Sequence, residues 1–551
     1  MTTGTLHTTP VASMNEASER DPFNNNCFGT LVDTPYKLIN LPVLDVKEFN
    51  ETVIRGYEEG WGEKDLPADK ALARSLVPAG TASLRDFSNI SPEIPEYIPA
   101  NCTGCMDCVT ECPDTAILGK VLGEDELELK LKSIPDADRE MYRAQWSKTK
   151  KYYDAGKKKL GMGGMFQIII DPSKCKGCAE CVIVCDDLAL KMVPKTDELI
   201  TQIRKSHRYF KNIGPSNEKY ISDSLLIDMM LKEKTHIYTG GAGSCAGCGE
   251  GTALRMMCSA TGSKYGDQWG IVAATGCNTV YTSTYPYNPY LIPWTNSLFE
   301  NAPADATGVR MRWDQMGWQN KPIWCIGGDG AMFDIGFQSL SRVLASGMNI
   351  KLFVLDTQVY SNTGGQASTA SYTGQNTKMS VHGKSVDGKQ ERRKEIAQIA
   401  MMHPRTYVAQ TTCAHINHFY KAVLGALEFD GPALVVCYTT CQPEHGVADN
   451  MAGEQARLAV DTRAFPLLVH DPRKGERLKE RLSLMGNPSM KDDWYVNPKT
   501  KEEVNFIDFA RSEGRFSKHF DKDGNPSQTL LHAKQDRLEN WRLLQELAGL
   551  R

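Results

Sequence analysis

The sequence has no run of 18 apolar residues, and its first 29 residues lack the basic start and apolar stretch of a secretory signal. We therefore expect neither a membrane span nor a signal peptide. It also lacks an excess of one charge, since 63 Lys and Arg residues stand against 67 Asp and Glu residues. This balance gives no support to nucleic-acid binding.

Cysteine, in contrast, is abundant. The chain has 17 cysteines, of which twelve fall into spaced groups typical of metal ligands rather than of a small disulfide-rich secreted domain. Because metal-binding thiolates must stay reduced, we expect a cytoplasmic location. Five cysteines lie outside this spacing and are interpreted as buried, unreactive thiols: Cys27, Cys258, Cys325, Cys413 and Cys437.

A length of 551 residues suggests two or three domains. Residues 1–95 read as an N-terminal arm, and 96–200 as a cysteine-rich domain with an insertion at about 120–160. Residues 201–470 form the main domain. Residues 471–551 are interpreted as an extension that packs on a neighbouring subunit, although packing on its own domain is equally simple.

Two further segments leave alternatives open. The first 30 residues are compatible with an arm or with a disordered leader. The insertion ends in a basic run that either docks an acidic electron carrier or is a solvated helix face: Lys148, Lys150, Lys151, Lys157, Lys158 and Lys159. Near the C-terminus, the pattern over 531–550 predicts an amphipathic helix with Leu538, Trp541, Leu544 and Leu547 on its apolar side.

From about residue 235, short apolar segments alternate with amphipathic ones, which predicts an α/β domain with a parallel sheet. The predicted strands are 271–275, 322–326, 350–355, 407–410 and 433–438. A helix is expected after Gly330, ending at Gly347. Its buried stripe is predicted to contain Ile335, Leu340, Val343 and Leu344.

The cysteine-rich domain contains one spacing twice, which indicates an internal duplication. The first copy is Cys102, Cys105, Cys108 and Cys112, followed by Pro113; the second is Cys175, Cys178, Cys181 and Cys185, followed by Asp186 instead of proline. This spacing is typical of a bacterial two-cluster ferredoxin, in which three cysteines of one copy bind a 4Fe-4S cluster and the fourth reaches the other cluster. A zinc site is the alternative, but the longer separation between Cys pairs of zinc ribbons is missing.

Four more cysteines are separated in sequence. Cys245 and Cys248 belong to a glycine-rich loop, while Cys277 and Cys441 each follow a predicted strand. Because the carboxyl ends of parallel strands meet at one edge of the sheet, these four thiolates are able to converge.

The third motif, Gly-Gly-Asp-Gly at 327–330, also follows a predicted strand, and Thr357 and Asn362 follow the next one. Glycines let the backbone approach a phosphate, and Asp329 with a second oxygen ligand can hold magnesium against a diphosphate. The motif therefore predicts a thiamine diphosphate site.

The segment 328–366, with Val-Tyr-Ser-Asn-Thr-Gly-Gly-Gln at 359–366, closely resembles the pyruvate:ferredoxin oxidoreductase family, and the resemblance covers about 95–470. It implies an α/β thiamine-diphosphate-binding domain preceded by a two-cluster ferredoxin-like α+β domain. Two segments depart from the family pattern, namely 367–372 and the loop from Gln442 to His445, and both affect substrate identity more than reaction type. His445 itself is either a contact to substrate or cofactor or a hydrogen-bonded structural imidazole.

The resemblance also assigns ligands and cofactor contacts. It implies one cluster on Cys102, Cys105, Cys108 and Cys185, a second on Cys112, Cys175, Cys178 and Cys181, and a third on Cys245, Cys248, Cys277 and Cys441. It implies that Mg²⁺ is bound by Asp329, Thr357 and the carbonyl of Val359. The thiamine diphosphate contacts are implied to be Gly328, Asp329, Gly330, Thr357, Val359, Cys248, Gly249 and the catalytic Asn362.

In function, the resemblance implies oxidative decarboxylation of a 2-oxoacid, most simply pyruvate, with coenzyme A as co-substrate and ferredoxin or flavodoxin as acceptor. The pyrimidine-binding, 2-oxoacid-binding and coenzyme A regions are not found in the sequence, so we expect a second subunit to supply them within a dimer of heterodimers. Two alternatives are 2-oxoglutarate as the substrate and a subunit that only transfers electrons. The complete set of Asp329, Thr357 and Asn362 argues against the second alternative.

Overall fold

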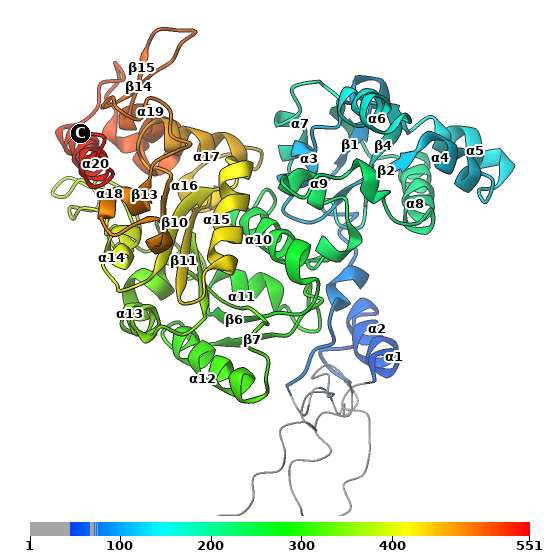
Figure 1. Ribbon diagram of the computed structural model, residues 1–551, viewed down its shortest axis with the longest axis horizontal. Coiled ribbons are helices and arrows are strands. Elements are labelled where there is room, and N and C mark those ends of the chain that lie inside the picture. Colours follow the sequence, from blue (N-terminus) through cyan, green and yellow to red (C-terminus); the bar gives the residue numbers. More distant parts are fainter. Residues whose placement is uncertain (1–44, 67–70, 72, 74) are drawn as a thin grey trace, which may run out of the picture. The chain divides into compact units, whose positions relative to one another are not determined.

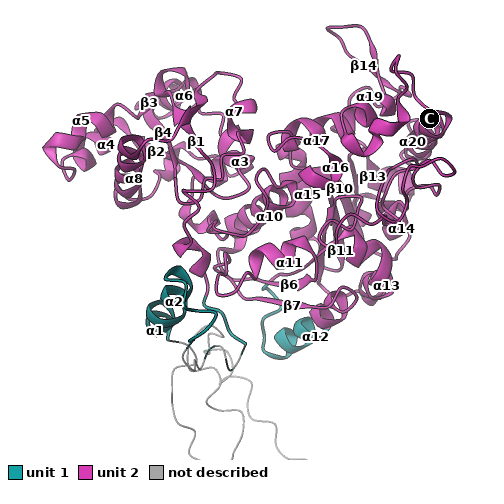
Figure 2. Cartoon of the chain, turned by 180° about the vertical axis from the view of Figure 1, so that it is seen from behind, with its two compact units in different colours: residues 1–78, 308–321 teal, residues 79–307, 322–551 magenta. Residues whose placement is uncertain are grey.

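The computed structural model describes residues 45–66, 71, 73 and 75–551. The chain divides into two compact units, 1–78 with 308–321 and 79–307 with 322–551 (Figure 2). The first 44 residues of the predicted arm, including Cys27, lie outside the described ranges. The first unit contains short helices and the later part of a longer one: α1 (Val46–Phe49), η1 (Asn50–Ile54), α2 (Arg55–Glu58) and α12 (Ala302–Gln315).

In the second unit, the duplicated cysteine motifs have the same local backbone. Met106 and Ala179 occupy equivalent positions, and both adopt the left-handed conformation, with φ of 74° and 65°. Each is followed by one turn of helix, α3 (Asp107–Thr110) after the first and α7 (Glu180–Ile183) after the second. The repeated spacing therefore corresponds to a repeated structure.

Two antiparallel pairings join the two copies. Strand β1 (Glu93–Tyr97), which precedes the first motif, pairs with β5 (Leu190–Pro194), which follows the second. Strand β2 (Ile117–Gly123) pairs with β4 (Gly164–Ile170) along its whole length, and β4 also pairs with β3 (Ser147–Lys148). The strands that flank the two cysteine motifs are therefore paired with each other.

The predicted insertion is helical and forms a small hydrophobic core together with Ile213. It contains α4 (Glu124–Leu131), α5 (Asp136–Arg143), η5 (Lys150–Asp154) and α6 (Ala155–Leu160). Its core includes Leu127, Tyr142 and Trp146. Part of the basic run is neutralised within the chain, since Lys148 pairs with Glu124 and Lys151 with Asp228, both at 2.6 Å.

The α/β prediction is confirmed by a sheet of eight strands in the order β13-β12-β10-β11-β9-β8-β6-β7. The parallel strands are β6 (Gly270–Ala274), β7 (Trp294–Ser297), β8 (Ile323–Gly328), β9 (Lys351–Asp356), β10 (Tyr407–Thr412) and β11 (Ala433–Tyr438). Two short antiparallel strands, β12 (Leu468–His470) and β13 (Leu482–Ser483), extend one edge. All five predicted strands are present, and β7, β12 and β13 are additional.

Helix α10 (Gly249–Tyr265) packs against both α15 (Ile416–Glu428) and α9 (Leu226–Met229) (Figure 1). Arg255 of α10 is 2% exposed and donates to the carbonyl oxygens of Val109 and, at 3.0 Å, Cys112. The Thr252 hydroxyl donates to the Glu111 carbonyl oxygen at 3.1 Å. The first cysteine motif is therefore attached directly to this helix.

The helix predicted after Gly330 is divided. A π-helical turn, η8 (Gly330–Ile335), is followed by α13 (Phe337–Ser346), which ends at Gly347 in the left-handed conformation. Leu340, Val343 and Leu344 are buried as predicted, but Ile335 is 60% exposed, so its place in the buried stripe was wrong. The π turn changes the register, which rotates Ile335 away from the stripe of α13.

The predicted C-terminal helix is α20 (Gln528–Leu547). It packs within its own unit against α19 (Phe506–Arg511). Trp541 is fully buried, its indole donates to the Asp492 carbonyl oxygen at 2.8 Å, and the Arg463 guanidinium lies 4.1 Å from its ring centroid. Packing on a neighbouring subunit stays a prediction.

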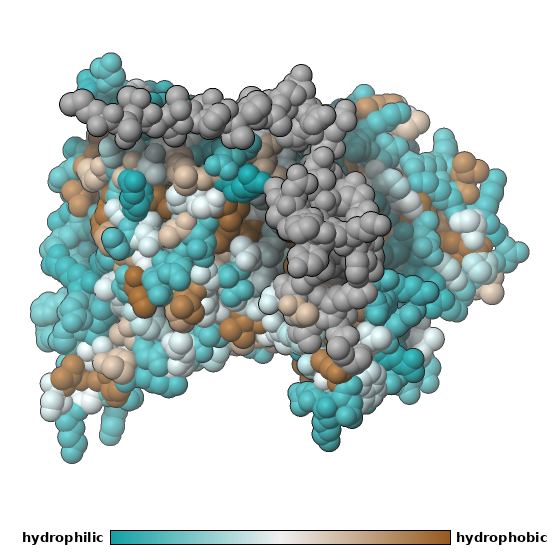
Figure 3. All heavy atoms as spheres, turned by 90° about the horizontal axis from the view of Figure 1, so that it is seen from below, coloured by the Kyte–Doolittle hydropathy of each residue, from teal (hydrophilic) through white to brown (hydrophobic). Residues whose placement is uncertain are grey.

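Among the described residues, no helix combines the length and the apolar character needed to cross a bilayer. The face shown in Figure 3 is mainly hydrophilic, with apolar residues scattered over it.

Replacing Trp541 by alanine should destabilise the second unit by about 3–5 kcal/mol, because a fully buried indole is lost together with its hydrogen bond. Leu543→Ala is the matched control, since Leu543 is on the same helix but 43% exposed, and its effect should stay within about 0.5 kcal/mol. Anaerobic scanning calorimetry measures both. Equal unfolding temperatures for the two variants would contradict the intrachain role of α20.

Candidate functional site

The predicted site residues gather at the carboxyl ends of four parallel strands. Cys277 follows β6, Asp329 follows β8, Thr357 follows β9 and Cys441 follows β11. Strands β6, β8, β9 and β11 are consecutive in the sheet, so their following loops are neighbours.

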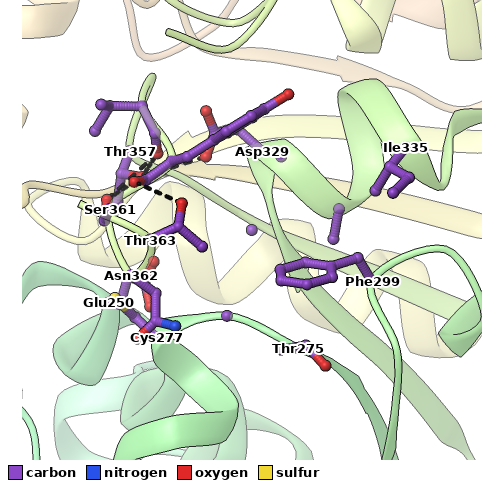
Figure 4. Close-up of a pocket in the computed structure, with 16 residues that line it drawn as sticks. Glu250, Thr275, Cys277, Phe299, Asp329, Ile335, Thr357, Ser361, Asn362 and Thr363 are labelled. Atoms are coloured by element: carbon purple, nitrogen blue, oxygen red, sulfur yellow. Dashed lines mark hydrogen bonds between the residues drawn. The ribbon is translucent and has the colours of Figure 1, made fainter. Parts of the chain in front are cut away.

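A cavity of about 270 Å³ lies among these loops (Figure 4). Asp329, Thr357 and Ser361 are at one end of it, and Phe299 and Ile335 lie across from them. We call it the diphosphate cavity. Its lining is Glu250, Thr275, Gly276, Cys277, Phe299, Gly328, Asp329, Gly330, Ala331, Ile335, Thr357, Val359, Tyr360, Ser361, Asn362 and Thr363.

The three predicted magnesium ligands are adjacent in this cavity. The Thr357 hydroxyl oxygen lies 3.3 Å from Asp329 Oδ1 and 3.0 Å from the Val359 carbonyl oxygen. Burial raises the pKa of Asp329 to about 8, and nearby Asp356 adds to the rise. A hard cation among these oxygens would offset the cost of burying the carboxylate, so the donor set fits Mg²⁺.

Residues outside the lining of the diphosphate cavity fix the loop that carries Thr357. Gln358 adopts a positive φ of 55°, and its backbone N–H donates to Asp356 Oδ1 at 3.2 Å. His445 Nε2 donates to the Thr357 carbonyl oxygen at 2.7 Å, and burial holds the pKa of His445 well below its usual value. Of the two interpretations of His445, the structure supports the hydrogen-bonded structural imidazole.

Glu250 is a site residue to which sequence reasoning gave no role. It is 4% exposed, and its Oε2 has no hydrogen-bond partner within the described residues. Burial raises the pKa of Glu250 to about 8, with a further rise from Asp329. Its place directly after Gly249, in the motif that carries Cys245 and Cys248, was the signal available in the sequence.

A second cavity, of about 210 Å³, adjoins the first and is lined by Cys245, Cys248, Cys277 and Cys441. We call it the inner cavity. Cys248 immediately precedes α10, Cys277 opens α11 (Cys277–Thr282) and Cys441 precedes α16 (Gln442–His445). Gly249 allows the Cys248 segment to lie close to Thr440, the residue before Cys441. A Cβ at position 249 would lie 2.5 Å from the Thr440 hydroxyl oxygen.

The other eight predicted ligands line two further cavities. The outer cavity contains Cys102, Cys105, Cys108 and Cys185, and the middle cavity contains Cys112, Cys175, Cys178 and Cys181. Each cavity thus takes three cysteines from one motif and one from the other, which is the crossed arrangement expected from the resemblance. Asp186 lies outside the lining of both cavities as described, so the missing proline does not alter this grouping.

The cysteine thiols of these sites would lose their protons on binding a metal. Burial raises the pKa of Cys105 and of Cys441 to about 11 each, so the free thiols are neutral and metal binding has to displace their protons. Over the described ranges, no three His, Cys, Asp or Glu side chains are grouped so as to hold a single metal ion. The sets of four surround cavities instead, as a multi-iron cluster requires.

The cysteines outside the ligand spacing are buried where the structure describes them: Cys258, Cys325, Cys413 and Cys437. The two segments that depart from the family pattern contact the site. Ser368 donates its hydroxyl proton to Asp329 Oδ2, and Gln442 and Pro443 line the inner cavity.

Residues 274–437 match the family model for the thiamine pyrophosphate enzyme C-terminal TPP-binding domain. The chain is 29% identical over 521 residues to the probable pyruvate-flavodoxin oxidoreductase of Escherichia coli, with 80% of this chain and 41% of that protein covered. It is 26% identical to the pyruvate:ferredoxin oxidoreductase of Moorella thermoacetica, with 86% and 44% covered. The chain thus spans less than half the length of these relatives.

A shorter relative matches more closely. The chain is 37% identical over 233 residues to the pyruvate synthase subunit PorB of Pyrococcus horikoshii, with 41% of this chain and 70% of that subunit covered. This match, the thiamine pyrophosphate domain and the cysteine-lined cavities agree with the resemblance carried by the motifs. The chain belongs to the pyruvate:ferredoxin oxidoreductase family.

Proposed function

We propose that this chain is the thiamine-diphosphate-binding and iron–sulfur subunit of a 2-oxoacid:ferredoxin oxidoreductase that converts pyruvate and coenzyme A to acyl-CoA and CO₂. One observation carries the proposal. The inner and diphosphate cavities share five lining residues: Glu250, Cys277, Thr357, Ser361 and Asn362. A cluster on the four inner cysteines would therefore adjoin the cofactor.

Bound thiamine diphosphate supplies a thiazolium carbon that adds to the 2-keto carbon and a ring that accepts the electrons left by decarboxylation. The chain's own residues bind and orient it. Asp329, Thr357 and the Val359 carbonyl would hold Mg²⁺, and Asn362, which lines both cavities, would contact the cofactor. Gly328 leaves room for phosphate, since a Cβ there would meet only the Leu355 carbonyl oxygen, at 3.8 Å.

The cysteines that line the inner, middle and outer cavities would hold three 4Fe-4S clusters, which would supply a path for electrons out of the site. A 4Fe-4S cluster accepts one electron at a time, so it suits stepwise removal of the two electrons that decarboxylation leaves. Cys102 and Cys105 of the outer cavity are partly exposed, which suits electron exit to ferredoxin or flavodoxin.

The pyrimidine-binding, 2-oxoacid-binding and coenzyme A regions come from a second subunit, in a dimer of heterodimers. Apolar side chains support this at the rim of the two cavities. Ile335 lines the diphosphate cavity and is 60% exposed, and Val280 lines the inner cavity and is 50% exposed. Leu298, next to Phe299 in the lining, is 59% exposed. Exposed apolar side chains around a cavity are typical of a surface that another protein covers.

The complex purified anaerobically should contain about twelve irons per copy of this chain, since three cubes hold four irons each, together with one thiamine diphosphate. It should reduce viologen in the presence of pyruvate and coenzyme A. A panel of 2-oxoacids tests the substrate. Faster turnover of 2-oxoglutarate than of pyruvate would identify 2-oxoglutarate as the substrate instead. Zinc in place of iron, or a preparation without thiamine, would exclude the function altogether.

Cys441→Ala should remove the inner cluster alone, because Cys441 contributes only to the inner cavity. Iron should fall from about twelve to about eight per chain, with pyruvate-dependent reduction lost. Cys258→Ala is the control, because Cys258 is fully buried on α10 and outside the ligand spacing. Unchanged iron in the Cys441 variant, or equal loss in the control, would refute the assignment of the inner cavity.

Asp329→Asn should weaken Mg²⁺-dependent binding of thiamine diphosphate by on the order of 100-fold or more, because a charged magnesium ligand is removed. Asp334→Asn is a nearby control whose carboxylate binds the Tyr360 and Thr369 hydroxyls instead. Isothermal titration of the cofactor-free complex measures both. Equal affinities for the two variants would show that Asp329 is not the ligand.

A further inference from the structure

A buried ion pair joins the middle cavity to the inner cavity. Lys176 lies between Cys175 and Cys178 in the sequence, and Asp114 lies two residues after Cys112. The ammonium nitrogen of Lys176 is 2.6 Å from Asp114 Oδ1, and the two side chains are 4% and 3% exposed.

The other hydrogen-bond partners of Lys176 lie in the loop that leads to Cys245, and its ammonium also lies 5.0 Å from the Phe87 ring centroid. Its ammonium donates to the carbonyl oxygens of Ala242 at 3.0 Å and Ser244 at 2.8 Å, and lies 2.9 Å from the Ser244 hydroxyl. That hydroxyl in turn lies 3.3 Å from Asp114 Oδ1. Lys176, which belongs to the middle-cavity loop, therefore binds Ser244, the residue directly before Cys245 of the inner cavity.

Stability alone is a weak reason for this arrangement. Desolvation of two charges commonly cancels their attraction, so apolar residues of similar size would fill the same space at no loss. We therefore attribute the pair to the connection that it makes between the middle-cavity loop and the loop that leads to Cys245. The ammonium makes directional bonds that fix the Cys245 loop relative to the Cys175 loop.

Lys174, on the other side of Cys175, provides a natural comparison. It is also buried, at 3% exposed, but its ammonium donates to the carbonyl oxygens of Ser83, at 2.7 Å, and Arg85. Both lysines are sequence neighbours of Cys175, but of the two only Lys176 is bonded to the loop that leads to Cys245.

We propose that Lys176 is a positioning residue that sets the geometry between the middle and inner clusters and that its charge raises the potential of the inner cluster. The inference rests on the proposed function, because it requires clusters in both cavities. Reduction makes a cluster more negative, so a fixed cation nearby stabilises the reduced form. Fixed separation matters because electron tunnelling slows steeply with distance.

The test uses the complete complex, fully reduced with dithionite, and two spectroscopic measurements. Electron paramagnetic resonance records the magnetic interaction between neighbouring reduced clusters, which depends on their separation and orientation. A redox titration followed by the same signals gives the potential of each cluster. Iron content and thermal unfolding are recorded for every variant.

Lys176→Met should weaken the interaction between the middle and inner clusters and shift the inner potential downward, with iron content retained. Lys174→Met should leave the interaction and the inner potential as in the wild type. Because Lys176→Met leaves Asp114 buried without its partner and can misfold, the double variant Asp114→Asn with Lys176→Met removes both charges. It too should show the weakened interaction, since the bonds to Ala242 and Ser244 are absent.

An interaction and an inner potential that match the wild type in both Lys176 variants would overturn the proposal, as would an equal change in Lys174→Met. A different result would show that the proposed function is wrong. In that case the wild-type complex itself would lack interacting clusters, which would exclude both the function and this inference.

Discussion

The contact between α10 and the cysteine-rich segment is the constraint on which the arrangement of sites depends. Arg255 is buried on α10 and satisfied by carbonyl oxygens around Cys112, so the first motif follows the position of this helix. The same helix begins at Gly249, directly after Cys248. Its placement therefore sets both the middle and the inner cavity. A buried guanidinium is costly unless fully bonded, which makes displacement of either part unfavourable.

Buried charges recur around this contact. Glu180 accepts from the backbone N–H groups of Ala452 and Gly453, at 3.1 Å and 2.8 Å, at the start of α17 (Ala452–Asp461). A glycine is required there, since a Cβ on Gly453 would lie 2.0 Å from Glu111. Glu180 precedes Cys181, so another middle-cavity cysteine is attached to the part of the chain that carries the sheet. Rigid placement of cluster loops suits electron transfer, in which distance controls rate.

Much of this site could be predicted because its chemistry depends on spacing and on strand ends. Twelve cysteines and the Asp329 motif lie in or beside elements that local patterns identify, and parallel topology brings Cys277 and Cys441 together. The pairing of β1 with β5, the exposure of Ile335 and the burial of Glu250 without a partner for its Oε2 within the described residues could not be predicted. Each depends on contacts between segments distant in sequence or, for Ile335, on a π turn that local periodicity does not reveal. Lys176 is the clearest case, since its neighbour in space, Ser244, is 68 residues away.

The central claim is that three clusters lie in the outer, middle and inner cavities and that the inner one adjoins the diphosphate cofactor. Anomalous diffraction at the iron edge, from crystals of the complete complex, tests it most directly. Three separate iron peaks per chain are expected, with one enclosed by Cys245, Cys248, Cys277 and Cys441 and in contact with the cofactor. Two peaks, or a third one away from those four sulfurs, would contradict the account.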